Sequence, residues 1–337
     1  MTQILRDSGA SFEKCPALSV SGLEIIRKGG RADRLVRGIN FTVGSSRTLA
    51  IVGESGSGKS LTCKAIAGLL DPRLAASGEI FMHDRLLSGL RERDWNNIRG
   101  RDIGYVFQNP FTALNPVLPI GRQISEALRV HGKLRGRAAA MEAKRILDLV
   151  RIGDPGRRMQ EYPHHLSGGM CQRVAIAMAI ACKPKLLIAD EPTTALDVTV
   201  QAEILDLLED LQQALGVALI IVTHDLGVAA RIAHDVVVMY GGTIMEKGPT
   251  SQVLSNPRHP YTLALLRSSP VNATKGRPLY TIPGSVSHLG GNPRGCVFVG
   301  RCDRATQECS IDTPQLQFVA GAQGASCHLV GVRNIAA

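Results

Sequence analysis

The 337-residue sequence lacks any hydrophobic stretch long enough to cross a membrane. Its most apolar window, 174–190, is interrupted by a Lys-Pro-Lys run, and the next, 216–225, ends in a histidine and an aspartate. A membrane-spanning helix needs about 20 apolar residues in succession. The first 20 residues have no long apolar core and carry Asp7 and Glu13, which excludes a signal peptide. We therefore expect a cytoplasmic protein that reaches a membrane only through a partner.

Closely spaced cysteine pairs are also absent. None of the eight cysteines forms the C-x2–4-C pair that is usual in zinc sites, and a cytoplasmic protein is not expected to hold structural disulfides. Both positively and negatively charged residues are well represented. Lys and Arg exceed Asp and Glu by 39 to 29, which gives a net charge of +10. This balance favours anionic partners such as nucleotides, nucleic acid or acidic lipid, and charge alone does not choose among them.

Short apolar runs alternate with helical stretches, which predicts an α/β fold. The runs are apolar throughout rather than alternating, as expected for a parallel sheet covered on both faces. They span residues 48–53, 103–107, 185–190, 218–223 and 235–240. Between the second and third runs, residues 121–153 carry apolar residues at helical spacing. We expect a helical subdomain at about 109–183 within an α/β core.

The composition changes after about residue 255. A helix is expected after Pro260, and the following stretch, 268–296, is rich in Pro, Gly and Ser. We therefore predict a first domain over 18–255 and a separate, irregular C-terminal region over 256–337. No internal repeat or low-complexity tract is present.

The octapeptide GESGSGKS at 53–60 fits the phosphate-loop motif G-x-x-x-x-G-K-[ST]. It follows an apolar strand and opens a predicted helix, which is the context that the motif requires. Backbone N–H groups of such a loop surround phosphate oxygens, the lysine reaches the β/γ-phosphates and the Ser hydroxyl binds Mg²⁺. The predicted nucleotide-binding residues here are Gly53, Glu54, Ser55, Gly56, Ser57, Gly58, Lys59, Ser60 and Leu61.

Two carboxylates end the apolar run LLIAD-E at 186–191. Asp190 is the expected Mg²⁺ ligand of a P-loop NTPase, together with Ser60. Glu191 is the expected general base toward the attacking water. A plain strand-to-turn exit explains such residues equally well in isolation, but the phosphate loop upstream favours the functional interpretation.

The stretch LSGGMCQRVAIAMAIA at 166–181 predicts a second helix-end phosphate site. Ser167 can cap a helix whose first turn exposes the backbone N–H groups of Gly168 and Gly169. The helix is apolar nearly all round and should be buried.

These motifs together resemble the ATP-binding cassette (ABC) family. The resemblance rests on their order along the chain: 53–60, Gln108 in YVFQNP, 166–172, 186–191, TALD at 194–197 and His224 in IVTHD. It implies an ABC-type P-loop core with a parallel sheet, an antiparallel β subdomain and a helical subdomain. It further implies that Gln108 senses the γ-phosphate and binds Mg²⁺, that His224 steadies the γ-phosphate and water, and that Asp197 lies at a dimer seam.

Within this family the chain resembles the ATPases of dipeptide, oligopeptide and nickel importers, over about residues 18–330. The resemblance rests on GESGSGKSLT, QNPFTALNP, ADEPTTALDVTVQAEIL and NPRHPYTLALL. It implies ATP and Mg²⁺ as cofactors and a peripheral place on the cytoplasmic face of the inner membrane. Its implied partners are a second, homologous ATPase, two membrane permease subunits and an extracytoplasmic binding protein. Peptides are the favoured cargo, with nickel or a metal chelate as the alternative.

Two positions depart from the family pattern. The signature has Met170 where glutamine is the commoner residue, and the segment 22–40 has no aromatic residue to stack on adenine. An aliphatic or arginine side chain near Arg34 or Leu35 is the expected substitute. A soluble cassette ATPase acting on nucleic acid is the less favoured alternative, because the sequence has a single phosphate loop and no sustained heptads. We expect no nucleic-acid partner.

Four of the eight cysteines lie in the C-terminal region, as C-x5-C-x6-C-x17-C. Four thiolates can hold a tetrahedral Zn²⁺ or an iron–sulfur cluster. The loose spacing and the family resemblance favour a [4Fe–4S] cluster, with Zn²⁺ as the alternative and four unligated thiols as the third. The predicted ligands are Cys296, Cys302, Cys309 and Cys327, and the ATP chemistry is expected to lie wholly upstream of them.

Overall fold

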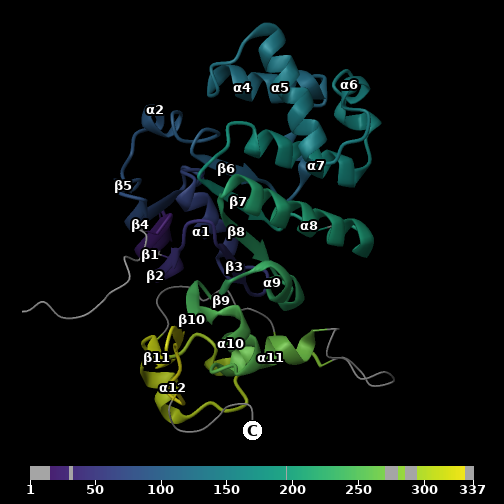
Figure 1. Cartoon of the computed structure of the whole chain (residues 1–337). Coiled ribbons are helices and arrows are strands. Elements are labelled where there is room, and N and C mark those ends of the chain that lie inside the picture. Colours follow the sequence, from purple (N-terminus) through teal and green to yellow (C-terminus); the bar gives the residue numbers. More distant parts are fainter. Residues whose placement is uncertain (1–15, 30–32, 195, 270–279, 285–293, 331–337) are drawn as a thin grey trace, which may run out of the picture.

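A computed structural model shows how these motifs are arranged (Figure 1). It describes residues 16–29, 33–194, 196–269, 280–284 and 294–330. Ala195 of the TALD motif, most of the Pro/Gly/Ser-rich stretch and the last seven residues of the predicted C-terminal domain lie outside the described residues. None of the helices in the described ranges has the length and hydrophobicity that a membrane span requires.

The main sheet has eight strands among the described residues, in the order β11-β12-β10-β9-β3-β8-β7-β6. Five consecutive strands, from β9 to β6 at the end of the sheet, are parallel, as predicted. They are β3 (Thr48–Val52), β6 (Ile103–Val106), β7 (Leu186–Asp190), β8 (Ala218–Thr223) and β9 (Asp235–Tyr240). β10 (Thr243–Pro249) continues the sheet antiparallel to β9.

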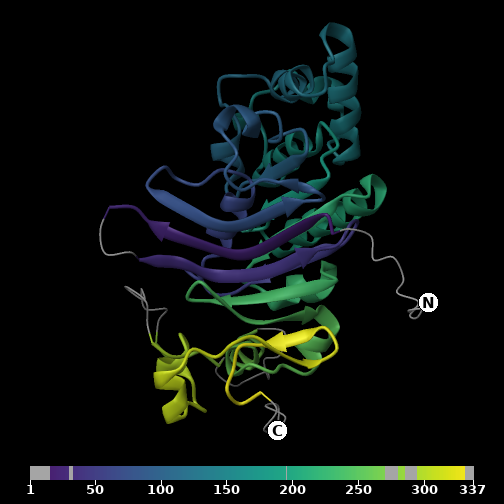
Figure 2. The ribbon, with the colours of Figure 1, turned by 90° about the vertical axis from the view of Figure 1, so that its left-hand side faces the viewer.

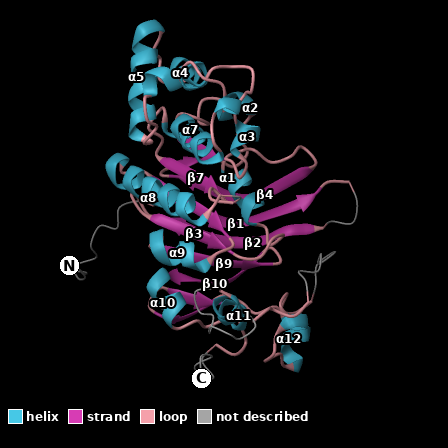
Figure 3. Ribbon diagram, turned by 90° about the vertical axis from the view of Figure 1, so that its right-hand side faces the viewer, coloured by secondary structure: helices cyan, strands magenta, loops and turns pink. Residues whose placement is uncertain are grey.

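Both faces of this sheet are buried. Ala50 and Val52 of β3 belong to one hydrophobic core, whereas Leu49 and Ile51 belong to another. The first core contains helices α7 (Gly168–Ile180), α8 (Val198–Leu215) and α9 (Leu226–Ile232). The second contains α1 (Lys59–Ile66) and the antiparallel subdomain. Figure 3 shows the stacked strands with α8 and α9 beside them. This two-sided burial explains why the strands are apolar throughout.

The antiparallel β subdomain has the strand order β2-β1-β4-β5. Its strands are β1 (Leu18–Arg27), β2 (Arg34–Val43), β4 (Leu74–Met82) and β5 (Arg85–Leu86). A short helix, α2 (Glu92–Trp95), follows it. The subdomain matches the prediction.

The helical subdomain lies above the sheet in Figure 1. It contains α3 (Pro110–Ala113), α4 (Ile120–Val130), α5 (Gly136–Leu149), α6 (Pro155–Arg158), η1 (Pro163–His165) and α7. Its core joins α4, α5 and α7 through residues such as Ile124, Ile146 and Val174. The predicted helical spacing therefore corresponds to real buried faces.

The C-terminal region contributes strands to the main sheet. After α10 (Thr250–Ser255) and α11 (Pro260–Ser268) come η3 (Val299–Arg301), α12 (Gln307–Ile311), β11 (Gln317–Ala320) and β12 (Gln323–Ala325). β12 pairs antiparallel with β10, which places β11 at the edge of the sheet (Figure 2). The domain boundary near 255 stays a prediction. The region that follows it is not separate from the sheet, because β10 offers an edge that β12 covers.

A buried carboxylate fixes this junction. Glu246 of β10 is fully buried and accepts hydrogen bonds from the backbone N–H groups of Arg258 (2.8 Å) and His259 (3.0 Å). It also accepts one from Nε2 of Gln323 in β12, at 2.8 Å. A buried carboxylate is stable only with such partners.

Candidate active site

The phosphate loop connects β3 to α1, as predicted. At two positions of the loop, the backbone conformation requires glycine. Gly53 has φ 155°, and a Cβ there would lie 2.1 Å from the Met239 carbonyl oxygen. Gly58, at the N-cap of α1, has φ 98°. Both conformations are open to glycine and strained for other residues. The loop therefore packs against the end of β9.

Lys59 is held inside the loop. Its side chain is 4% exposed, and Nζ donates to the carbonyl oxygens of Gly53 (2.7 Å) and Glu54 (2.9 Å). Nζ also lies 3.9 Å from Oε1 of Glu191. Burial lowers the pKa of Lys59, and the nearby carboxylates oppose that shift. A positively charged group thus lines the cleft beside the loop, where it is suited to bind an anion such as phosphate.

Ser60 and Asp190, the predicted Mg²⁺ ligands, lie in contact with each other. Ser60 Oγ donates a 2.8 Å hydrogen bond to Asp190 Oδ1, and the Tyr105 hydroxyl donates one of 2.9 Å to Oδ2. Asp190 ends β7, beside the phosphate loop. Hydroxyl and carboxylate oxygens are the ligands that Mg²⁺ prefers, with nucleotide phosphates completing the shell. The residues present therefore fit Mg²⁺ with a bound nucleotide.

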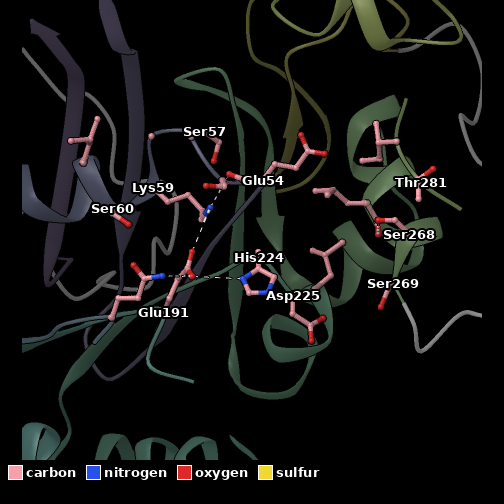
Figure 4. Close-up of a pocket in the computed structure, with 18 of the residues that line it drawn as sticks. Glu54, Ser57, Lys59, Ser60, Glu191, His224, Asp225, Ser268, Ser269 and Thr281 are labelled. Carbon is pink, nitrogen blue, oxygen red and sulfur yellow. Dashed lines mark hydrogen bonds and ion pairs between the residues drawn. The ribbon is translucent and has the colours of Figure 1, made fainter. Parts of the chain in front are cut away.

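Glu191 is the centre of a hydrogen-bond network. Its Oε2 accepts from Gln108 Nε2 (3.1 Å) and Thr194 Oγ1 (3.0 Å), and lies 3.7 Å from Nδ1 of His224 (Figure 4). Its backbone is left-handed, with φ 46°, which is uncommon for a non-glycine residue. The three predicted catalytic residues Glu191, His224 and Gln108 therefore meet at one point.

The contact between His224 and Glu191 changes the acidity of both side chains. Interaction with His224, followed by the Thr194 hydroxyl and the Lys59 charge, lowers the pKa of Glu191 although partial burial acts against it. The same interaction raises the pKa of His224. Glu191 is therefore ionised at neutral pH and can accept a proton.

A cleft of about 860 Å³ lies over these groups. Residues 54–61 of the loop, Gln108, Glu191 and His224 line one part of it. Ser57 Oγ is buried beside the cleft with no hydrogen-bond partner in the described chain, so it is open to an incoming acceptor. The other wall comes from the C-terminal region: Leu265, Ser268, Ser269, Tyr280, Thr281 and Ile282. The sequence analysis did not predict this second wall.

The signature residues lie elsewhere. Ser167 caps α7 by accepting a hydrogen bond from the Met170 N–H, at 3.3 Å, as expected. The cleft lining does not include Ser167, Gly168 or Gly169. Asp197 caps α8 in the same way, through the Val200 N–H at 3.0 Å. The start of α7 therefore contributes no residue to the described lining of this cleft.

The four C-terminal cysteines line one small cavity, together with His259 and His328. Burial raises the pKa of Cys296 and Cys302, and that of Cys327 to about 11. No group of three or more His, Cys, Asp or Glu residues in the described ranges is arranged to hold a metal ion. The predicted ligands are therefore gathered without being set in a coordinating geometry, and the iron–sulfur or zinc assignment stays a prediction.

The phosphate loop, the Ser60–Asp190 pair and the glutamate network define a P-loop nucleoside triphosphatase with an ABC-type subdomain arrangement. The family described as "ABC transporter" matches residues 36–194. The family described as "Oligopeptide/dipeptide transporter, C-terminal region" matches residues 245–309.

Similar proteins cover nearly the whole chain. A putative peptide import ATP-binding protein of Brucella melitensis is 48% identical over 326 residues, 93% of this chain and 96% of its own length. The dipeptide transport ATP-binding protein DppD of Escherichia coli is 44% identical over 296 residues, covering 88% and 90%. The chain belongs to this family of ABC transporter ATP-binding proteins, and its enzymatic activity is ATP hydrolysis coupled to transport.

A solved structure supports the fold assignment. The dimeric post-hydrolysis state of an ATP-binding cassette bound to ADP and Pi is similar with a TM-score of 0.62 and 28% identity. The match covers 69% of this chain and 98% of that one. Part of this chain is therefore not matched by that structure. The C-terminal region has its own family match, over residues 245–309.

Proposed function

We propose that the chain is the ATP-hydrolysing subunit of an importer for dipeptides or oligopeptides, on the cytoplasmic face of the inner membrane. The identity of 48% over 93% of the chain with a peptide import ATP-binding protein carries this proposal. The match of residues 245–309 to the C-terminal region of oligopeptide/dipeptide transporters supports it.

The geometry supports hydrolysis in a single displacement. Ser60, Asp190 and Gln108 would hold Mg²⁺, which would offset part of the negative charge of the bound nucleotide. Lys59 binds phosphate oxygens of the nucleotide from inside the loop. Glu191 orients a water and takes its proton as the water oxygen bonds to the γ-phosphorus and the bond to ADP breaks. His224 and Gln108 hold the Glu191 carboxylate in place.

A second ATPase subunit completes the site in this proposal. Gly168 and Gly169 are not among the described residues that line the cleft of their own chain. A homologous subunit in head-to-tail contact brings its own signature to the γ-phosphate bound here. Two permease subunits and an extracytoplasmic binding protein are the other proposed partners, with no nucleic acid.

The cargo and the partners can be tested together. The tagged chain is purified in mild detergent from its native host, and the co-purifying binding protein is assayed with peptides, nickel and metal chelates. We expect two permeases, a second ATPase and a peptide-binding protein. A binding protein selective for nickel or a chelate would replace the peptide assignment. Salt-sensitive RNA or DNA without membrane subunits would overturn the importer assignment.

We further propose that Cys296, Cys302, Cys309 and Cys327 hold a [4Fe–4S] cluster, with Zn²⁺ as the alternative. Four thiols lining one cavity are the donor set that both require. Purification without oxygen should give brown protein with iron and sulfide in equal amounts. Colourless protein with one zinc would establish the alternative, and metal-free folded protein would reject both.

A further inference from the structure

The phosphate loop is bound from outside by an arginine of the C-terminal region. Arg301 Nη1 donates to Glu54 Oε2 at 2.6 Å, and Nη2 donates to Glu54 Oε1 at 3.1 Å. The Arg301 side chain is 8% exposed. Two parallel, charge-assisted hydrogen bonds in a largely buried place fix both position and orientation. Glu54 is the second residue of the phosphate loop, so the contact acts on the loop directly.

The Arg301 guanidinium is itself fixed. It donates to the carbonyl oxygens of Pro283 (2.7 Å) and Ile282 (3.2 Å), and its carbon lies 5.6 Å from the ring centroid of Tyr240. Tyr240 packs edge-on against Phe298, which lies three residues before Arg301. The arginine is therefore a rigid support for Glu54.

A second contact reaches the backbone of Glu54. Its N–H donates to the hydroxyl of Tyr261 in α11, at 2.9 Å. On the other side, the Glu54 carbonyl accepts from Lys59 Nζ. Any displacement of Glu54 therefore moves an acceptor that holds the phosphate-binding lysine.

The arginine lies between two of the cavity-lining cysteines. Its turn, η3, is bounded by hydrogen bonds from Val299 N–H to the Cys296 carbonyl (3.1 Å) and from Cys302 N–H to the Val299 carbonyl (3.4 Å). The Cys296 N–H donates to the Cys309 carbonyl at 2.7 Å. The backbone that carries Arg301 is thus built on the wall of the cysteine cavity.

We infer that Arg301 is a positioning residue for the phosphate loop. We also infer that, through Arg301, a structural change at the cysteines lining the cavity alters the affinity for ATP. The contacts connect the cavity wall to Arg301 through η3, and Arg301 to Lys59 through Glu54. This inference concerns ATP binding alone and holds for any cargo, so it fails or succeeds separately from the proposed transport function.

The first test measures MgATP affinity of the full-length chain by competition with a fluorescent nucleotide. Arg301→Ala should weaken binding about tenfold, with a smaller fall in kcat at saturating ATP. Arg301→Lys should recover only part of the loss, because an ammonium cannot form both bonds. The matched control is exposed Arg267→Ala, which should bind as the wild type does. Affinity within twofold of the wild type in Arg301→Ala overturns the inference.

The second test asks whether Arg301 acts through Glu54. The single variants Glu54→Gln and Arg301→Gln are compared with the double variant in the same assay. Each single variant removes the same contact between Arg301 and Glu54. The double variant should therefore bind MgATP no more weakly than the single variant with the lower affinity. Independent, multiplicative losses would show that Arg301 acts elsewhere, which overturns the route proposed here.

The third test addresses the cavity. Cys302→Ser is introduced into the wild type and into Arg301→Ala. It should weaken MgATP binding severalfold in the first background and leave it unchanged in the second. An equal loss in both backgrounds, or no loss in the wild type, overturns the link between the cavity and the loop.

Discussion

Ser60 Oγ donates a 2.8 Å hydrogen bond to Asp190 Oδ1, although the two residues are 130 positions apart. The bond connects the start of α1 to the end of β7. It places a hydroxyl and a carboxylate at one edge of the sheet, because the carboxyl ends of parallel strands meet there. The proximity of these two groups is therefore a direct consequence of the sheet order.

Removal of the Asp190 charge should weaken Mg²⁺ binding. In Asp190→Asn we expect the Mg²⁺ concentration for half-maximal ATPase activity to rise about tenfold or more, because one anionic ligand is lost. The measurement is a Mg²⁺ titration at constant ATP. Tyr105→Phe is the matched control, since it removes only the hydrogen bond to Oδ2. An unchanged Mg²⁺ dependence in Asp190→Asn would contradict the assignment.

Glu191→Gln should separate binding from hydrolysis. The amide keeps the size of the side chain and cannot take a proton from water, so turnover should fall by about 10²–10⁴-fold. ATP binding should be retained, because Lys59 and the loop N–H groups are unchanged. Single-turnover hydrolysis and nucleotide binding are measured on the same preparation. Full residual turnover would show that Glu191 is not the base.

The sequence singled out Lys59, Asp190 and Glu191 because each stands in a local motif. The strands that lead to Gly53 and Asp190 are otherwise apolar, which predicted buried parallel strands. In the structure β8 lies between β3 and β7, and all three are parallel, so their carboxyl ends lie on the same side of the sheet. Gln108 and His224 were assigned by resemblance, and the structure places both beside Glu191.

The contacts of the C-terminal region could not be predicted in this way. Arg301 and Glu54 are separated by 247 positions, and neither stands in a motif that names the other. The pairing of β12 with β10 has only two registered residue pairs and no hydrophobic alternation to signal it. A Pro/Gly-rich composition predicts an irregular chain and says nothing about which surface that chain covers.

Tyr261→Phe should destabilise the chain modestly. The change removes the acceptor of the Glu54 N–H and leaves the ring packing against Tyr240 and Phe298 intact. A buried donor without a partner costs about 1–3 kcal/mol. We expect a lower thermal midpoint for unfolding and a weaker affinity for MgATP than in the wild type. An unchanged midpoint would show that water replaces the tyrosine hydroxyl.

His259 is a buried, neutral histidine at the junction of the C-terminal region. It is 1% exposed, and its Nδ1 accepts a hydrogen bond from the Tyr261 N–H at the start of α11. Burial lowers the pKa of His259 from 6.5 to about 3. Its backbone N–H donates to Glu246, whose own pKa is raised by burial. Acidification therefore has opposite effects on folding stability at these two groups: it lowers the contribution of His259 and raises that of Glu246.

The sign of the His259 contribution follows from proton binding. Between pH 6.5 and about 3 the unfolded chain binds a proton at this residue that the folded chain does not. Folding stability from His259 is therefore complete above pH 6.5 and is lost as the pH falls, by about 2 kcal/mol between pH 7 and 5. His259→Asn keeps a side-chain acceptor for the Tyr261 N–H and removes the titration. Its thermal midpoint should fall less than that of the wild type over this range, whereas exposed His164→Asn should behave as the wild type. Equal falls in His259→Asn and the wild type would show that His259 is protonated in the folded chain. Comparison between variants removes the Glu246 contribution, because that residue titrates in all of them.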